Sequence, residues 1–100
     1  MATIYEVLQS TGLPCVFSHF KEPVKPPYLA YIGDGQDTAS ADDTYYWREN
    51  RYQIEYYFTK KSEADEAVIE DKLLANGFYY TKSPDTYIES EGVWVIYYNV

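Results

Sequence analysis

The chain has 100 residues, the usual size of one domain with a single hydrophobic core. Hydrophobic residues make up 46% of it, which excludes a chain that is disordered throughout. Sixteen acidic against eight basic residues give a formal net charge of −8, which argues against binding to nucleic acid or to an anionic membrane, because both need clustered lysine and arginine.

Thirteen residues are tyrosine, which is typical of strands and of protein interfaces. The N-terminal sequence lacks the basic and apolar regions of a signal peptide, and no run of about 18 apolar residues occurs. We therefore expect synthesis in the cytoplasm and no membrane span. The single cysteine, Cys15, leaves no partner for an internal disulfide.

The first 32 residues predict one short helix and two strands. Thr3 can cap a helix with Glu6 as its capping-box partner, and Gly12 ends it. Three segments follow: a strand over residues 15–20, a stiff proline-rich connector over 22–27, and a second strand over 28–32.

Residues 33–43 read as a loop throughout, because they are acidic and small and contain no large apolar residue. Residues 44–59 are strand-like. A straight strand of that length would run about 50 Å, too long for this domain, so we expect it to bend or to fold back near residues 48–50. Together, residues 33–50 are predicted to form a mobile acidic loop or hairpin arm.

Residues 52–77 predict a strand with one core-facing side, followed by the main helix. One face of the strand carries Tyr52, Ile54, Tyr56 and Phe58. Ser62 is the expected helix cap, with Asp65 at its third position and Gly77 just beyond the C-terminus. The expected apolar stripe of this helix consists of Ala64, Val68, Ile69 and Leu73.

The C-terminal segment predicts a strand over residues 78–82 and a hairpin of strands 87–89 and 93–98 around Glu91 and Gly92. The last strand is apolar on both faces, which suits a central or interface-covered strand. The order of elements predicts a single α+β domain over residues 1–100, an antiparallel tyrosine-rich sheet with two helices packed on one face.

Residues suited to chemistry are few. Cys15 and His19 are the only thiol and imidazole, and in one strand they would lie about 13 Å apart, too far to share a metal. The acidic residues of the loop do not have EF-hand spacing, and no glycine-rich phosphate motif occurs. Aromatic residues beside Arg48 could stack bases, but the net charge argues against it. We therefore expect no catalytic residue, no cofactor and no metal.

Three stretches together carry a family resemblance. Pro27-Tyr-Leu-Ala-Tyr31 precedes Arg51-Tyr-Gln-Ile-Glu-Tyr-Tyr-Phe58, which runs directly into the capped helix, and Gly92-Val-Trp-Val-Ile-Tyr-Tyr98 closes the chain. The pattern resembles the small tail-completion, or head–tail joining, proteins of long-tailed bacteriophages and prophages, which are similar in fold to tail terminators. The resemblance covers most of the chain but rests on soft hydrophobic patterns, and the proline-rich connector and heavy tyrosine content depart from it.

The resemblance implies a ring, usually a hexamer, that caps the tail tube and docks it to the head connector in the virion neck. Its partners would be other copies of the chain, the tail tube protein and the connector protein. It also implies that residues 33–50 reach a neighbouring subunit. The residues expected at the assembly interface are Asp34, Asp37, Asp42, Asp43, Tyr45, Tyr46, Trp47, Arg48, Trp94 and Tyr98.

A second interpretation follows from the charge alone. A small acidic chain can act as an inhibitor or decoy that covers a basic surface of a host protein. An enzyme has the least support, because no nucleophile and base assemble from the residues present. Recovery of a single host nucleic-acid-binding protein in a pull-down would favour the decoy.

Overall fold

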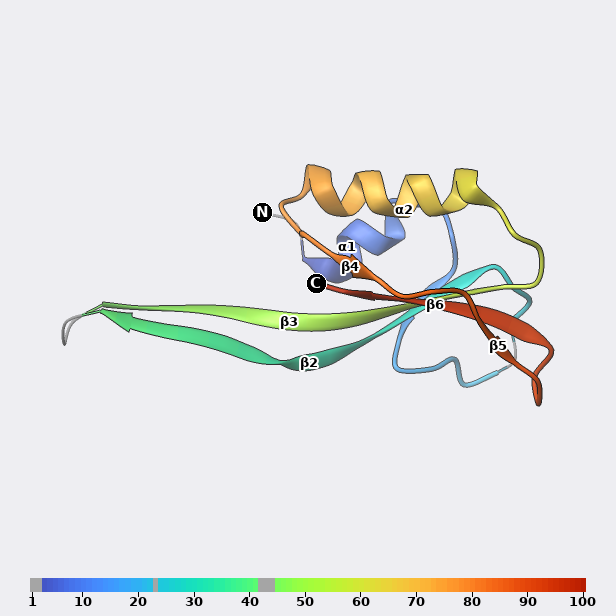
Figure 1. Ribbon diagram of the computed structural model, residues 1–100, viewed down its shortest axis with the longest axis horizontal. Coiled ribbons are helices and arrows are strands. Elements are labelled where there is room, and N and C mark those ends of the chain that lie inside the picture. Colours follow the sequence, from blue (N-terminus) through green and yellow to red (C-terminus); the bar gives the residue numbers. More distant parts are fainter. Residues whose placement is uncertain (1–2, 23, 42–44) are drawn as a thin grey trace.

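The computed structural model describes residues 3–22, 24–41 and 45–100 and has an α+β architecture. Both helices lie on the same side of a six-stranded mixed sheet (Figure 1). The sheet order is β1-β2-β3-β6-β4, and β5 also pairs with β6. The elements are α1 (Ile4–Gln9), β1 (Cys15–Phe17), β2 (Tyr28–Ala41), β3 (Tyr45–Phe58), α2 (Glu63–Ala75), β4 (Thr81–Lys82), β5 (Thr86–Ile88) and β6 (Val93–Asn99).

The sheet is mostly antiparallel, as expected, but β1 and β2 are parallel, with Val16 opposite Ala30. The fully antiparallel sheet predicted from the sequence is therefore wrong at this edge. Parallel neighbours require a crossover connection, and the chain supplies one in the proline-rich segment between β1 and β2. This segment also forms one wall of a groove on the sheet.

Both helix caps are confirmed. Thr3 Oγ1 accepts a hydrogen bond from Glu6 N at 3.2 Å, and the Glu6 carboxylate accepts one from Thr3 N at 3.1 Å. Ser62 Oγ accepts from Asp65 N at 3.2 Å. Gly77 follows α2 with a φ of 81°, which glycine adopts without strain. Neither helix in the described part of the chain is long and apolar enough to cross a membrane.

The inward face of α2 differs from the predicted stripe. Ile69 and Leu73 are fully buried, but Ala64 and Val68 face solvent. The inward position one turn before Ile69 is held by Glu66, which is only 3% exposed. The buried face of the helix is therefore rotated from the predicted apolar stripe. Neighbouring lysines neutralise the buried charge of Glu66, which makes this orientation possible.

The core lies between the helices and the β3–β6 pair. The predicted face of β3 is confirmed, because Ile54, Tyr56 and Phe58 are buried. Strand β6 continues this face with Ile96, opposite Tyr56. Its other face is covered as well, since Val95 is also fully buried. The prediction of a central strand is confirmed, because β6 lies between β3 on one side and β4 and β5 on the other.

The largest correction concerns residues 33–43 and 44–59. Residues 33–41 are not a loop, because β2 runs through them to Ala41 and pairs with β3. Strand β3 is a single 14-residue strand that does not fold back. The expectation of a turn assumed that the strand had to fit within a compact body. It projects instead, and the molecule extends 52 × 26 × 25 Å.

Two other boundaries are shorter than predicted. Strand β1 ends at Phe17, because Ser18 has a φ of 70° and His19 N donates to Phe17 O at 2.9 Å. Of the predicted strand 78–82, only Thr81–Lys82 pairs with β6. The C-terminal hairpin is confirmed, with β5 against β6.

Two adjacent leucines of α2 provide a test of the core. Leu73 is fully buried and Leu74 is 46% exposed. Leu73→Ala should lower the free energy of unfolding by about 3 kcal/mol, because it leaves a cavity in the core. Leu74→Ala should change it by about 0.5 kcal/mol or less. Urea denaturation of both variants measures the difference, and equal losses would contradict this orientation of α2.

Candidate functional site

The feature that departs most from a compact domain is the hairpin arm, which we define as residues 36–41 of β2 and 45–50 of β3. Six residue pairs join its strands, from Gln36 opposite Asn50 to Ala41 opposite Tyr45. Strand β1 ends opposite Tyr31, and the pairing of β3 with the C-terminal segment ends at Tyr52. Among the described residues, the arm therefore pairs only with itself, and it projects from the body (Figure 1).

A β-bulge separates the arm from the body. The register between β2 and β3 shifts between Gly33 and Gln36, and Gly35 has a φ of 88°. Only glycine adopts this conformation readily, and bulges of this kind bend and twist the strand that carries them. Asp34, an expected interface residue, lies in this bulge and is exposed.

The side-chain contacts of the arm are exposed. Arg51 Nε lies 3.1 Å from Asp37 Oδ2, and its Nη1 lies 4.0 Å from Glu49 Oε1. Gln36 Nε2 donates to Asn50 Oδ1 at 2.7 Å. Exposed ion pairs contribute about 0 to 1 kcal/mol each, and an isolated two-stranded ribbon is marginal in water. The arm is thus suited to gain stability from a partner.

Most of the expected interface residues lie along this ribbon. Asp37 and Arg48 are exposed on the arm. Tyr45, Tyr46 and Trp47 occupy the first three positions of β3, opposite Ala41, Ser40 and Ala39. Asp42 and Asp43 lie outside the described residues.

The two expected interface residues of β6 lie in the body and differ in exposure. Trp94 is 38% exposed and packs against Tyr87, with 5.0 Å between the ring centroids. Tyr98 is fully buried, and its hydroxyl donates to Glu70 Oε2 at 2.8 Å. Tyr98 is therefore a core residue and offers no contact surface, because α2 of the same chain covers its face of the strand.

A charged cluster that the sequence did not predict ties α2 to the sheet. Glu66 contacts Lys82 Nζ through Oε1 and Lys61 Nζ through Oε2, each at 2.8 Å. Lys82 Nζ also lies 2.8 Å from Glu70, and Lys61 Nζ lies 3.1 Å from Asp85. Four segments of the chain meet here: the β3–α2 connection, α2, β4 and the β4–β5 connection. The one sequence signal for this charged cluster is a glutamate at a helix position that faces the core.

The pKa shifts in this cluster keep its charges fixed at neutral pH. Burial opposes ionisation of Glu66 and Glu70, but Lys61 and Lys82 lower the pKa of Glu66, and Lys82 together with the Tyr98 hydroxyl lowers the pKa of Glu70. Burial disfavours the charge of Lys82 too, yet its glutamate partners raise its pKa. Catalytic groups usually have pKa values near the working pH. The pKa values of this cluster are shifted away from neutral pH, so the cluster is suited to holding α2 against the sheet.

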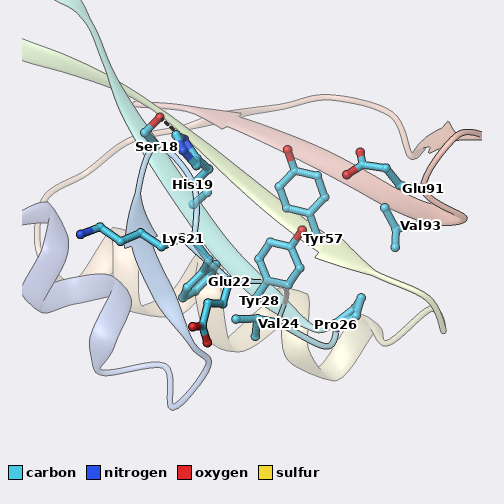
Figure 2. A pocket seen from close by; sticks show the side chains of 12 residues that line it. Ser18, His19, Lys21, Glu22, Val24, Pro26, Tyr28, Tyr57, Glu91 and Val93 are labelled. Atoms are coloured by element: carbon cyan, nitrogen blue, oxygen red, sulfur yellow. Dashed lines mark hydrogen bonds between the residues drawn. The ribbon is translucent and has the colours of Figure 1, made fainter.

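An open groove of about 530 Å³ lies on the sheet face opposite the helices (Figure 2). Its apolar lining consists of Phe20, Val24, Pro26, Tyr28, Ala30, Tyr57 and Val93. The Tyr28 and Tyr57 rings stack with centroids 4.8 Å apart, and Phe20 meets Tyr28 edge-on at 5.5 Å. Polar groups at its margin include His19 and Lys21 on the loop side and Glu91 on the side of β6.

The tyrosine hydroxyls of the groove stay neutral. Burial, then Glu91 and Glu55, raise the pKa of Tyr28. Burial, then the hydrogen bond that its hydroxyl donates to Glu55, raises the pKa of Tyr57. The groove could not be predicted from the sequence, because it depends on where the loop between β1 and β2 crosses the sheet.

The comparisons assign no family. No protein-family model and no curated protein matches the chain. Among the described residues, no three His, Cys, Asp or Glu side chains gather to hold a metal ion.

The charged cluster predicts how stability depends on pH. The folded-state pKa values of Glu66 and Glu70 lie below their unfolded values, so their contribution is present above about pH 4.3 and is lost as the pH falls through the folded values. The raised pKa of Lys82 gives a contribution that is complete below about pH 10.4 and is lost as the pH rises further. Urea denaturation should show a plateau between these limits.

Glu66→Gln should lower the free energy of unfolding at pH 7 by about 1 to 3 kcal/mol, because it removes the buried charge that two lysines neutralise. The lysine side chains are 44% and 35% exposed, so solvent screening keeps the loss in this range. Asp71→Asn, on the exposed side of the same helix, is the matched control and should cost little. Equal losses would rule out a stabilising role for the cluster.

The arm predicts a gradient of hydrogen exchange in the free chain. Amides that bond only across the arm should exchange faster than those of the three-strand region, such as Tyr56 and Ile96, because the arm can open without breaking the core. Residue-resolved exchange by NMR measures this directly. Equal protection in a monomer would mean that the arm is stable without a partner.

Proposed function

We propose that this chain is a non-enzymatic structural protein of a long-tailed bacteriophage or prophage, tail-terminator-like in fold. It assembles as a ring, expected to be a hexamer, at the end of the tail. There it joins the tail tube to the head connector in the virion neck. Its partners are further copies of itself, the tail tube protein and the connector protein, and it needs neither nucleic acid nor a membrane.

The hairpin arm is the observation that carries this proposal. A two-stranded ribbon with open edges is a liability for a protein that works alone, because unpaired strand edges recruit other chains. The same ribbon is useful in an assembly, where main-chain groups and side chains become buried against a neighbour. The resemblance implies such a reaching segment at residues 33–50, and the arm occupies that position.

The shape of the molecule also supports a ring. The arm and the body are different surfaces at opposite ends of a molecule 52 Å long. A contact between unlike surfaces is heterologous, and heterologous contacts generate closed rings when the rotation between subunits closes. A symmetric dimer would instead require one surface to match itself.

The reactive groups of the chain favour a structural role over catalysis. Burial raises the pKa of the Cys15 thiol to about 11, so the nucleophilic thiolate is scarce at neutral pH. The lysines and glutamates of the charged cluster neutralise one another. These ion pairs stabilise the body of the domain, and the arm of another copy can pack against that body.

A variant without the arm tests the proposal. We define the armless variant as the chain in which residues 37–49 are replaced by Asn-Gly, a sequence that forms a tight hairpin turn. Native mass spectrometry and light scattering over a range of concentrations, with and without tail tubes of the encoding phage or prophage, should show rings for the wild type. The armless variant should remain monomeric and keep its melting temperature, because the core lies outside the arm.

Several outcomes would contradict the proposal. A wild-type chain that stays monomeric in all conditions and binds neither tail tubes nor connectors cannot be a ring-forming neck protein. Recovery of one basic host protein in a pull-down, without self-association, would favour the acidic decoy. An armless variant that assembles as the wild type does would remove the arm from the assembly surface.

A further inference from the structure

We infer that the groove between the β1–β2 loop and the sheet is the receptor for the hairpin arm of a second copy of this chain. The inference rests on the proposed function and specifies the surface that the arm contacts. Each subunit would insert its arm into the groove of the next, so that one head-to-tail contact, repeated, builds the assembly.

Geometry separates the two features within one molecule. Tyr28, in the floor of the groove, and Ala41, at the end of the arm, are the two ends of β2. A strand of this length spans about 43 Å. In Figure 1 the arm projects at one end, while the β1–β2 loop and the β5–β6 hairpin lie at the other. The arm therefore cannot reach the groove of its own chain, but it can reach that of a neighbour.

The floor of the groove is aromatic. Phe20, Tyr28 and Tyr57 form a continuous row of rings, and Val93 and Ala30 add apolar surface beside them. Figure 2 shows Tyr28 and Tyr57 lying between the loop that carries His19 and the segment that carries Val93. Tyrosine and tryptophan bury large areas against such rings. The arm brings Tyr45, Tyr46 and Trp47 in sequence, one of the densest aromatic runs in the chain.

Charge favours the same pairing. Residues 33–50 hold five acidic residues against one arginine, and the groove wall carries charges of both signs, with Lys21 on the loop and Glu22 and Glu91 as its carboxylates. Lys21 forms no ion pair with the described residues. A chain with a net charge of −8 repels its own copies at long range. An arm that docks with its carboxylates beside Lys21 and away from Glu91 places opposite charges together at the contact, which fixes the orientation of the pair.

Complementary variants test this inference directly. Val24→Arg places a long charged side chain in the groove but leaves the arm intact, and the armless variant keeps an open groove. Each variant alone should be monomeric. Mixed in equal amounts, they should form one-to-one heterodimers and nothing larger, because the arm of the Val24→Arg chain enters the groove of the armless chain and no further arm–groove pair remains. Native mass spectrometry, with and without tail tubes, measures this.

Matched controls separate blocking from misfolding. Val68→Arg makes the same substitution on the exposed side of α2, across the sheet from the groove, and should associate within about twofold of the wild type. Lys21 is exposed, so Lys21→Glu should keep the fold and should weaken association on the order of tenfold, whereas Lys72→Glu on α2 should not. Melting temperatures confirm that each variant is folded.

The results distinguish this inference from the proposed function. If the wild type forms rings but Val24→Arg and Lys21→Glu also do, or the mixed variants do not pair, the groove is not the receptor and the ring proposal stands. Dimers of Val24→Arg alone, without dimers of the armless variant, would indicate pairing between two arms and would overturn the inference. A wild type that never associates contradicts both.

Discussion

Strand β3 positions both the core and the projecting arm. Its C-terminal half lies between β2 and β6 and carries Ile54, Tyr56 and Phe58 into the core beneath α2. Its N-terminal half pairs with β2 alone within the described residues. One strand thus anchors the domain and also forms half of the projecting arm. Because the anchored half is buried on the helix side, the direction in which the arm leaves the body is fixed by the core and by the bulge at Gly35.

Electrostatics reinforces this division. The buried charges gather in the body, where Glu66 links Lys61 and Lys82 and so ties α2 to the edge of the sheet. Such a cluster stabilises a unique orientation of the helix only while both signs are present. The charges of the arm are exposed and acidic in excess, which makes them available to a partner. The two regions therefore differ: the cluster around Glu66 neutralises its charges internally, whereas the arm exposes Asp37 and Glu49 to solvent.

Local interactions made part of this fold predictable from the sequence. The capping box of Thr3 and Glu6, the core face of β3 and the C-terminal hairpin depend on residues close in sequence or on strict alternation. The strand through residues 33–41 was missed because glycine, aspartate, serine and alanine have low strand propensity, and only pairing with β3 holds them extended. Glu66 was not part of the predicted inward stripe, because its second cation, Lys82, is distant in sequence. The groove depends on a loop crossing that no periodicity encodes, and of the predicted interface residues Tyr98 proved to be core.

In the proposed ring, each subunit inserts its arm into the groove of the next. This arrangement would explain why one chain carries an unsupported ribbon at one end and an open aromatic groove at the other. In such a ring a neighbouring copy stabilises the arm. Hydrogen exchange of the arm amides, measured in the free chain and again in the assembled ring, tests it most directly. We expect a large gain of protection in residues 36–41 and 45–50 on assembly, together with protection of the loop 18–22. Unchanged exchange in the arm of an assembled ring would contradict it.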